Sequence, residues 1–317
     1  MSLHHLHLLL NHVPTVGAVA ALALLLLGFV RRNEHLTHVG LEALYVVALL
    51  TLPAYISGAA AYRDLRDAPG VSDIAMRLHQ DVALWGFIWI EFAGFVAWLA
   101  LWQTRRHGRA ARGLVAASTV LLVVSIVIMG RAGNLGGEIR HPEIRAGAPE
   151  TYTGAALDNE VAAEQFVAAA ISQFVVYSTW ASPAGETVHF LGMSLSIGVL
   201  LAVNLRILGV MRQVPFAAVH RLLPWGMLGF GVNLVTGMFF FVGQPGQYVQ
   251  NVPFYWKVGF LMIAGANFLY LTVFKKMWAA DASESSVADK TMAVSSIIAW
   301  LAVLYAGRML PFLGNAF

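Results

Sequence analysis

Eight long apolar segments limit what this chain can fold into. They cover residues 13–31, 38–62, 79–104, 112–131, 184–208, 220–242, 253–278 and 290–312. Each is long enough to cross the hydrocarbon core of a bilayer as a helix, which takes about 20 residues. The backbone inside lipid must satisfy its own hydrogen bonds, so runs of this length form helices. The sequence therefore predicts an all-α integral membrane protein with eight transmembrane helices.

Composition agrees with this class and excludes several kinds of chemistry. Hydrophobic residues make up 58% of the chain and charged residues 12%, whereas ordinary soluble domains are about a quarter charged. The absence of cysteine excludes disulfides, thiolate-bound iron–sulfur clusters and covalent c-type haem. The net charge of +3 is assigned to basic loops and not to nucleic-acid binding, because no basic cluster lies on a soluble domain.

A long polar linker separates the helices into two groups of four. We expect a first four-helix bundle at 1–131, an outer-side linker at 132–183 and a second four-helix bundle at 184–317. Within the linker, 158–181 has the pattern of an amphipathic helix. Its apolar part is too short to span, so we expect it to lie along the membrane interface.

Orientation follows from the distribution of Lys and Arg. Twelve of them flank the loops after the first, third, fifth and seventh helices, and eight lie on the opposite side. The richer side is expected to be cytoplasmic, which places both termini and the linker outside. The chain start lacks a basic region and a cleavage site, so the first helix is expected to be retained.

Three histidines fall at one membrane level in this topology. His12 begins the first helix, His79 begins the third, and His189 lies early in the fifth; His141 in the linker can reach the same level. Two neutral imidazoles on facing helices are what b-type haem requires. The favoured axial pair is His12 with His79, and His189 with His141 forms a weaker second set, so one or two haems are expected. The competing interpretation has these rings bonded only to water or carbonyl groups.

Other residues on this side are candidates for supporting roles. Arg77, Arg131 and Arg140 can pair with haem propionates, because guanidinium groups suit carboxylates. Histidines cluster near the chain start at His4, His5 and His7, and imidazoles so spaced bind copper, nickel or zinc. As an alternative to haem, the metal-ligand candidates are therefore His7, His12, His79 and His189. A terminal histidine cluster can equally be incidental.

Glu91 lies near the middle of the third apolar segment. An intramembrane carboxylate is costly unless it is paired or protonated, and such groups often mark proton paths. We expect Glu91 to handle protons beside a quinone. A protonated Glu91 that hydrogen-bonds a neighbouring helix is the structural alternative.

The first half of the chain resembles a family of bacterial four-helix membrane domains of unassigned function that are predicted to bind b-type haem. The matching residues are His12-Val13-Pro14, Gly58, His79 and Asn134-Leu135-Gly136-Gly137-Glu138. Family members often have His-Leu-Gly-Gly at the last motif, and this chain has Asn134 in place of that histidine. The nearest substitute is His141.

The second half is similar to another uncharacterised family, with the layout of copper-resistance D-type and cytochrome b561-like bundles. The matching residues are His189-Phe190-Leu191-Gly192, Asn204 through Gly209, Pro224-Trp225, Thr236-Gly237 and Asn251 through Lys257. Relatives usually have Asp where this chain has Asn204. Together the two resemblances cover most of residues 7–275, and they imply a fusion of two four-helix domains.

The function expected from these features is that of a membrane b-type cytochrome subunit. It would transfer electrons between the quinone pool and a cytochrome or other redox partner on the outer side, as part of a complex in a bacterial inner membrane. Its expected contacts are lipid, quinone and that partner, with no nucleic acid. The alternative is a non-haem membrane subunit or a copper-handling transporter. No hydrolytic triad, phosphate-binding glycine loop or Cys/His zinc motif is present.

Overall fold

The computed structural model describes residues 3–66, 68, 69, 71, 73–139, 167–273, 278 and 285–313. It is 89% helical, and no strand occurs among these residues. Eight helical segments are long and apolar enough to cross a membrane. The predicted all-α membrane fold with eight spanning helices is therefore confirmed.

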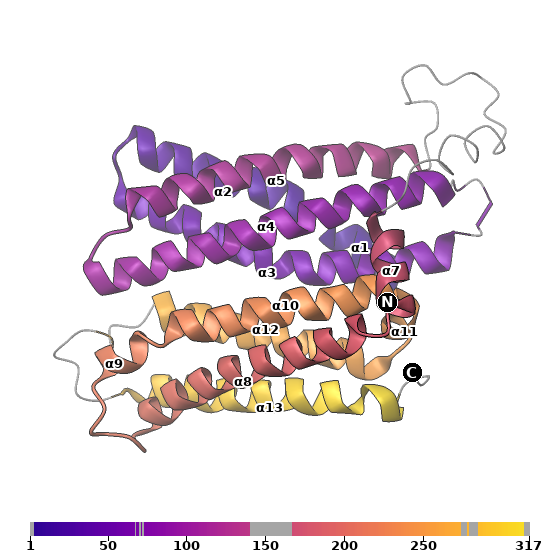
Figure 1. Ribbon diagram of the computed structural model, residues 1–317. Helices are drawn as coiled ribbons and strands as arrows, with labels where there is room; N and C mark the ends of the chain where they lie inside the picture. Colours follow the sequence, from indigo (N-terminus) through magenta and orange to yellow (C-terminus); the bar gives the residue numbers. More distant parts are fainter. Residues whose placement is uncertain are drawn as a thin grey trace. The chain divides into compact units, whose positions relative to one another are not determined.

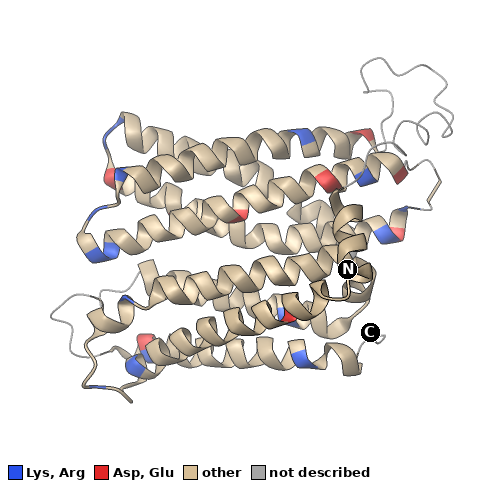
Figure 2. Ribbon diagram, in the orientation of Figure 1, with Lys and Arg blue, Asp and Glu red and all other residues tan. Residues whose placement is uncertain are grey.

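Helices make up most of the described residues (Figure 1). Their bounds are α1 Leu3–Leu10, α2 His12–Val30, α3 Glu34–Leu65, α4 Asp73–His107, α5 Arg112–Glu138, α7 Val167–Tyr177, α8 Ala181–Leu208, α9 Phe216–His220, α10 Leu223–Gly243, α11 Pro245–Val249, α12 Val252–Val273 and α13 Val287–Leu313. Charged residues gather near the ends of the long helices, and the middle sections carry few (Figure 2).

The first spanning segment begins earlier than the apolar pattern predicts. It runs from His4 to Val30 and includes both α1 and α2, whereas the predicted range was 13–31. The reason lies in the composition of α1, which consists only of leucine and histidine. Leucine is a strong helix former, so the histidine-rich start is helical and joins the membrane segment.

The chain divides into two compact units. The first unit contains 1–94, 118–178 and 242–246; the second contains 95–117, 179–241 and 247–317. Helix α4 thus contributes to both, with the change after Gly94. The units interleave along the sequence, and the domain bounds 1–131, 132–183 and 184–317 stay a prediction.

In the first unit, α3 is the central packing partner. Both α1 and α2 pack against it, and its buried face includes Leu41, Leu44 and Ala48. Small residues let α2 and α3 approach closely: a Cβ at Gly28 would lie 2.8 Å from the backbone nitrogen of Thr37. Membrane helices commonly associate through such small-residue contacts.

The short helix α7 is fixed to α4 by one carboxylate. Asp81 accepts hydrogen bonds from the backbone N–H groups of Val167 at 2.8 Å and Ala168 at 3.1 Å. These groups have no partner inside α7 because they belong to its first turn. A helix was predicted over 158–181, and α7 falls within that range; residues 158–166 lie outside the described residues.

In the second unit, polar side chains and glycines join the helices. Asn204 on α8 donates to Ser296 on α13 at 3.0 Å, and Asn267 on α12 donates to Ser295 at 3.1 Å. A Cβ at Gly229 on α10 would lie 2.7 Å from the Gly192 carbonyl oxygen on α8, so α8 and α10 touch through their backbones.

The later part of α4 packs in this second unit through Trp98. Its side chain is 0% exposed, stacks on Phe268 with ring centroids 5.1 Å apart, and donates Nε1–H to Thr272 Oγ1 at 3.3 Å. One turn later, Trp102 donates Nε1–H to the His220 carbonyl at 3.0 Å. These two tryptophans explain why α4 changes unit midway along its length.

Candidate functional site

His7 is held against α3 in the first unit. Its Nδ1 lies 3.0 Å from the Ala54 carbonyl oxygen and 3.4 Å from Ser57 Oγ. The Ser57 hydroxyl donates its own proton to Ala54 O, so both oxygen atoms act as acceptors toward the ring. A carbonyl cannot donate, and Nδ1 of His7 must therefore carry a proton.

His79 on α4 has the same arrangement with α5. Its Nδ1 lies 2.8 Å from the Ala132 carbonyl oxygen, which again can only accept. Neutral imidazole has one protonated nitrogen, so in both histidines Nε2 is left with a free lone pair. When a histidine binds a metal through one ring nitrogen, proteins usually orient the ring by a hydrogen bond from the other nitrogen, often from Nδ1–H to a carbonyl.

The two rings are alike in tautomer and belong to the same unit. His7 and His79 lie within electrostatic range of each other, and both are half-buried. They come from helices α1 and α4, whose positions in the sequence are more than 70 residues apart. The pair therefore offers two neutral nitrogen ligands from separate helices inside one unit.

Glycines stand directly beside both rings. A Cβ at Gly58 on α3 would lie 2.9 Å from His7 Cε1, and a Cβ at Gly136 on α5 would lie 3.3 Å from His79 Cε1. The first distance is too short for any real side chain, and the second is tight. Glycine at these two positions lets each imidazole lie against a helix backbone.

The other predicted ligands have different surroundings. His12 is exposed at the start of α2, and within the part of the chain that the structure describes its ring makes no hydrogen bond. The His12–His79 pair stays a prediction; it is His7 that has the same hydrogen-bonded arrangement as His79. His141 lies outside the described residues, so the His189–His141 set is also untested.

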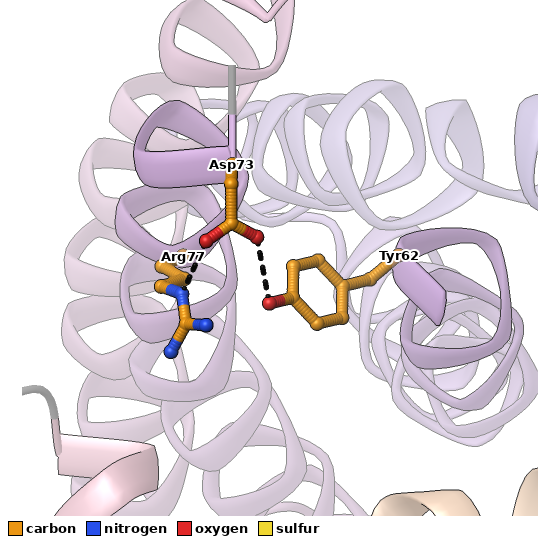
Figure 3. Close-up of polar contacts among 3 residues, drawn as sticks. All are labelled: Tyr62, Asp73 and Arg77. Atoms are coloured by element: carbon orange, nitrogen blue, oxygen red, sulfur yellow. Dashed lines mark hydrogen bonds and ion pairs between the residues drawn. The ribbon is translucent and has the colours of Figure 1, made fainter. Parts of the chain in front are cut away.

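Of the residues predicted to pair with haem propionates, Arg77 and Arg131 lie in the first unit, and Arg140 lies outside the described residues. Arg77 donates Nε–H to Asp73 at 2.8 Å, and Asp73 also accepts from the Tyr62 hydroxyl at 2.8 Å. Figure 3 shows the carboxylate between these two side chains. The remaining N–H groups of Arg77 point to no other side-chain acceptor in the described ranges. Arg131 is exposed on α5.

Glu91 lies on α4 in the first unit, with one carboxyl oxygen buried. In the described ranges, Oε1 has no hydrogen-bond partner. Tyr45 on α3 is within electrostatic range of the carboxyl group. A buried carboxyl oxygen without a partner is costly, and such a cost is typical of a group with a function in proton transfer.

In the second unit, His189 also points Nδ1 at an oxygen atom. Thr236 Oγ1 lies 2.7 Å from it, and this hydroxyl also lies 2.7 Å from the Val232 carbonyl on its own helix.

Outside the spanning segments, burial raises the pKa of Tyr248 on α11 to about 12, and the carboxylate of Glu186 adds to the shift. This phenol is therefore neutral at physiological pH.

A copper site of the predicted kind needs at least three ligands in most proteins. Among the described residues, no three His, Asp or Glu side chains come together in that way. His4 and His5 contact each other, with ring centroids 4.9 Å apart. Copper binding stays a prediction.

The chain was compared with protein-family models, curated proteins and solved structures, and no match was found in any of the three. The resemblances to two uncharacterised membrane families therefore stay predictions, and the functional argument depends on the geometry of the site.

Sequence reasoning gave His7 only a minor role. A signal for its position was present: His4 and His7 are three residues apart, which places them on one face of a helix, and the residues around them are leucines. Nothing in the sequence marks the backbone carbonyl groups of Ala54 and Ala132 as the acceptors for these rings. They are identified only when the backbone is placed.

Proposed function

We propose that the protein is a membrane b-type cytochrome subunit in which His7 and His79 are the axial ligands of a haem. The proposal rests on the hydrogen bonds and the tautomer that the two rings have in common. Each donates Nδ1–H to a backbone carbonyl, each has its lone pair on Nε2, and the two belong to one unit. Axial histidines of b-type haem are expected to have these properties.

The residues around the rings fit the group. The ligands are neutral imidazoles on two helices of a membrane bundle, the kind of location in which bundle proteins build cofactor sites. Gly58 and Gly136 leave both rings against backbone, which restricts their rotation. Bound haem would supply a one-electron Fe(III)/Fe(II) couple, and the chain's own part is to orient the two nitrogen ligands and exclude water.

The function that follows is electron transfer in the bacterial inner membrane. The proposed electron partners are a quinone in the bilayer and a cytochrome or redox subunit on the outer side, within a membrane complex. Both termini would face outward, because the loops on the other side carry more Lys and Arg. Glu91 is the candidate for proton transfer, since its buried Oε1 has no partner in the described ranges.

The test is the cofactor content of the purified full chain. Extraction into alkaline pyridine should give the haemochrome spectrum of haem b, with one haem per chain if only His7 and His79 bind. A second haem would support the additional use of His189. Stoichiometric copper with no haem would favour the copper-handling alternative, and a folded protein with neither would favour a non-haem membrane subunit.

A further inference from the structure

The turn that joins α4 to α5 in the second unit carries a cluster of arginines. Arg105 and Arg106 lie in the last turn of α4, Arg109 follows the end of that helix, and Arg112 begins α5. We call residues 105–112 the arginine turn. The chain has no Asp or Glu anywhere from 92 to 137, so no carboxylate close in sequence balances these charges.

Hydrogen bonds close the arginine turn at both ends. Gly108 has a φ of +76°, which favours glycine, and its N–H donates to the Thr104 carbonyl at 2.8 Å, as in a glycine cap that ends a helix. The side-chain oxygen of Gln103 accepts from the backbone N–H of Ala111 at 2.9 Å. This bond ties the chain just before α5 to the last turns of α4, so the two helix ends hold the arginines close together.

Trp102 indicates the level of the arginine turn in the membrane. Its Nε1–H donates to the His220 carbonyl at 3.0 Å, and its indole stacks on the His220 ring with centroids 5.6 Å apart. The guanidinium carbon of Arg106, one turn later, lies 5.9 Å from the centre of this indole. Tryptophan is enriched where spanning helices reach the lipid headgroups. The arginine turn therefore lies at headgroup level, at the end of spanning helix α4 (Figure 2).

The four guanidinium groups have no anionic partner within the part of the chain that the structure describes. Arg105, Arg109 and Arg112 are exposed, and Arg106 is half-buried. None of them lies within 4.0 Å of a described carboxylate oxygen, unlike Arg77 of the first unit. The positive charge of the arginine turn is therefore available to an anion outside the chain.

The position and the charge together select the anion. At headgroup level, the anion beside the protein is the phosphodiester of a phospholipid. Guanidinium groups suit phosphate oxygens, because they donate two parallel hydrogen bonds. A zwitterionic lipid carries the same phosphate, but the four arginines repel its ammonium group. A headgroup with net negative charge is therefore favoured, as clustered basic residues beside a membrane generally favour anionic lipids.

We propose that Arg105, Arg106, Arg109 and Arg112 bind the phosphate headgroup of one anionic phospholipid. This site goes beyond the proposed function and depends on neither haem nor quinone. The competing explanation is that these arginines only set the orientation of the chain in the membrane. In that case they would hold no particular lipid once the bilayer is removed.

The experiment is a lipid titration of the full chain in a non-ionic detergent, with bound lipids counted by native mass spectrometry. The probe is phosphatidylglycerol, and the wild type should bind one molecule of it in preference to phosphatidylcholine. Arg105→Gln with Arg109→Gln should raise the Kd about thirtyfold, since each basic residue near anionic lipid contributes about fivefold. Arg31→Gln with Arg32→Gln is the matched control, because it removes two exposed arginines at the end of α2. Its Kd should not change.

Further arms separate charge, folding and the source of the phosphate. Arg105→Lys with Arg109→Lys keeps the charge and should keep most of the affinity, and size-exclusion elution checks that each variant is folded. An excess of inorganic phosphate should leave the lipid bound. The proposal is overturned if phosphatidylcholine binds equally well, if inorganic phosphate displaces the lipid, or if the folded double glutamine variant at positions 105 and 109 keeps the wild-type Kd.

Discussion

His7 on α1 and His79 on α4 lie within electrostatic range of each other, and each ring donates Nδ1–H to a backbone carbonyl. The two carbonyl acceptors fix the tautomer of both rings. In both rings the remaining lone pair is on Nε2. The proposed function and the first two predictions below depend on it.

The first prediction concerns the ligand pair. Replacing either His7 or His79 by alanine should abolish haem binding at this site, because a low-spin b-type haem needs both axial nitrogens. His12→Ala is the matched control: this ring is exposed and lies one and a half turns from His7, and its removal should leave haem content unchanged. Haem per chain in purified protein is the measurement. Loss of haem in His12→Ala with retention in His7→Ala would reverse the assignment.

The second prediction tests the glycines. A methyl group at Gly58 would lie 2.9 Å from His7 Cε1, so Gly58→Ala must displace the ring and should lower haem occupancy or shift the redox midpoint. Gly130→Ala on α5 is the control, because a Cβ there meets nothing within 4 Å. Identical spectra and midpoints in the two variants would show that Gly58 does not shape the site.

The third prediction concerns proton transfer. Glu91→Gln keeps the shape of the side chain but cannot ionise, so it should slow quinol-dependent reduction of haem by about tenfold or more. The haem spectrum in dithionite should not change. Glu138→Gln provides the control, since Glu138 accepts from Asn134 at the end of α5 and lies outside the expected path. A Glu91→Gln protein that reduces haem at the normal rate would leave Glu91 with a structural role.

The fourth prediction concerns stability. Trp98 is fully buried, and Trp98→Ala should lower the free energy of unfolding by about 3 kcal/mol through lost packing and a cavity. Trp85, on the same helix, is 45% exposed, and Trp85→Ala should cost much less. Unfolding in a titration with sodium dodecyl sulfate measures both. Equal costs would contradict the packing described for the later part of α4.

The fifth prediction concerns the attachment of α7. Asp81→Ala leaves the N–H groups of Val167 and Ala168 without their partner and should destabilise α7 by about 1 kcal/mol, as loss of a helix cap does. Hydrogen exchange at residues 167–177 should quicken. Asp64→Ala, at an exposed position on α3, should leave that exchange unchanged. Unaltered exchange in Asp81→Ala would mean that α7 is held without Asp81, by the hydrogen bond from the Ser172 hydroxyl to the Gly243 carbonyl at 2.7 Å and by the buried Val175.

The membrane fold could be predicted from the sequence because few backbone structures satisfy their own hydrogen bonds in lipid. Apolar length alone located all eight spans but misplaced several of their ends, most of all at the start, where His4, His5 and His7 interrupt the leucines that continue the first helix. Hydropathy treats histidine as polar and ends the segment there. In the structure these residues are helical, and His7 is packed against α3.

The site was only partly accessible, since it depends on contacts between distant residues. His79 was identified from its place at a helix start, but its carbonyl partner Ala132 is 53 positions away. No periodicity encodes that distance. The same holds for Trp98 and Thr272, which are 174 positions apart.

The most direct test of the ligand pair is an absorption spectrum of the purified full chain, before and after reduction with dithionite. The expected result is a sharp alpha band and an intensified Soret band, both missing in His7→Ala and His79→Ala and both present in His12→Ala. A folded, colourless wild-type protein, or spectra that survive the loss of His7 and of His79, would contradict haem ligation by this pair.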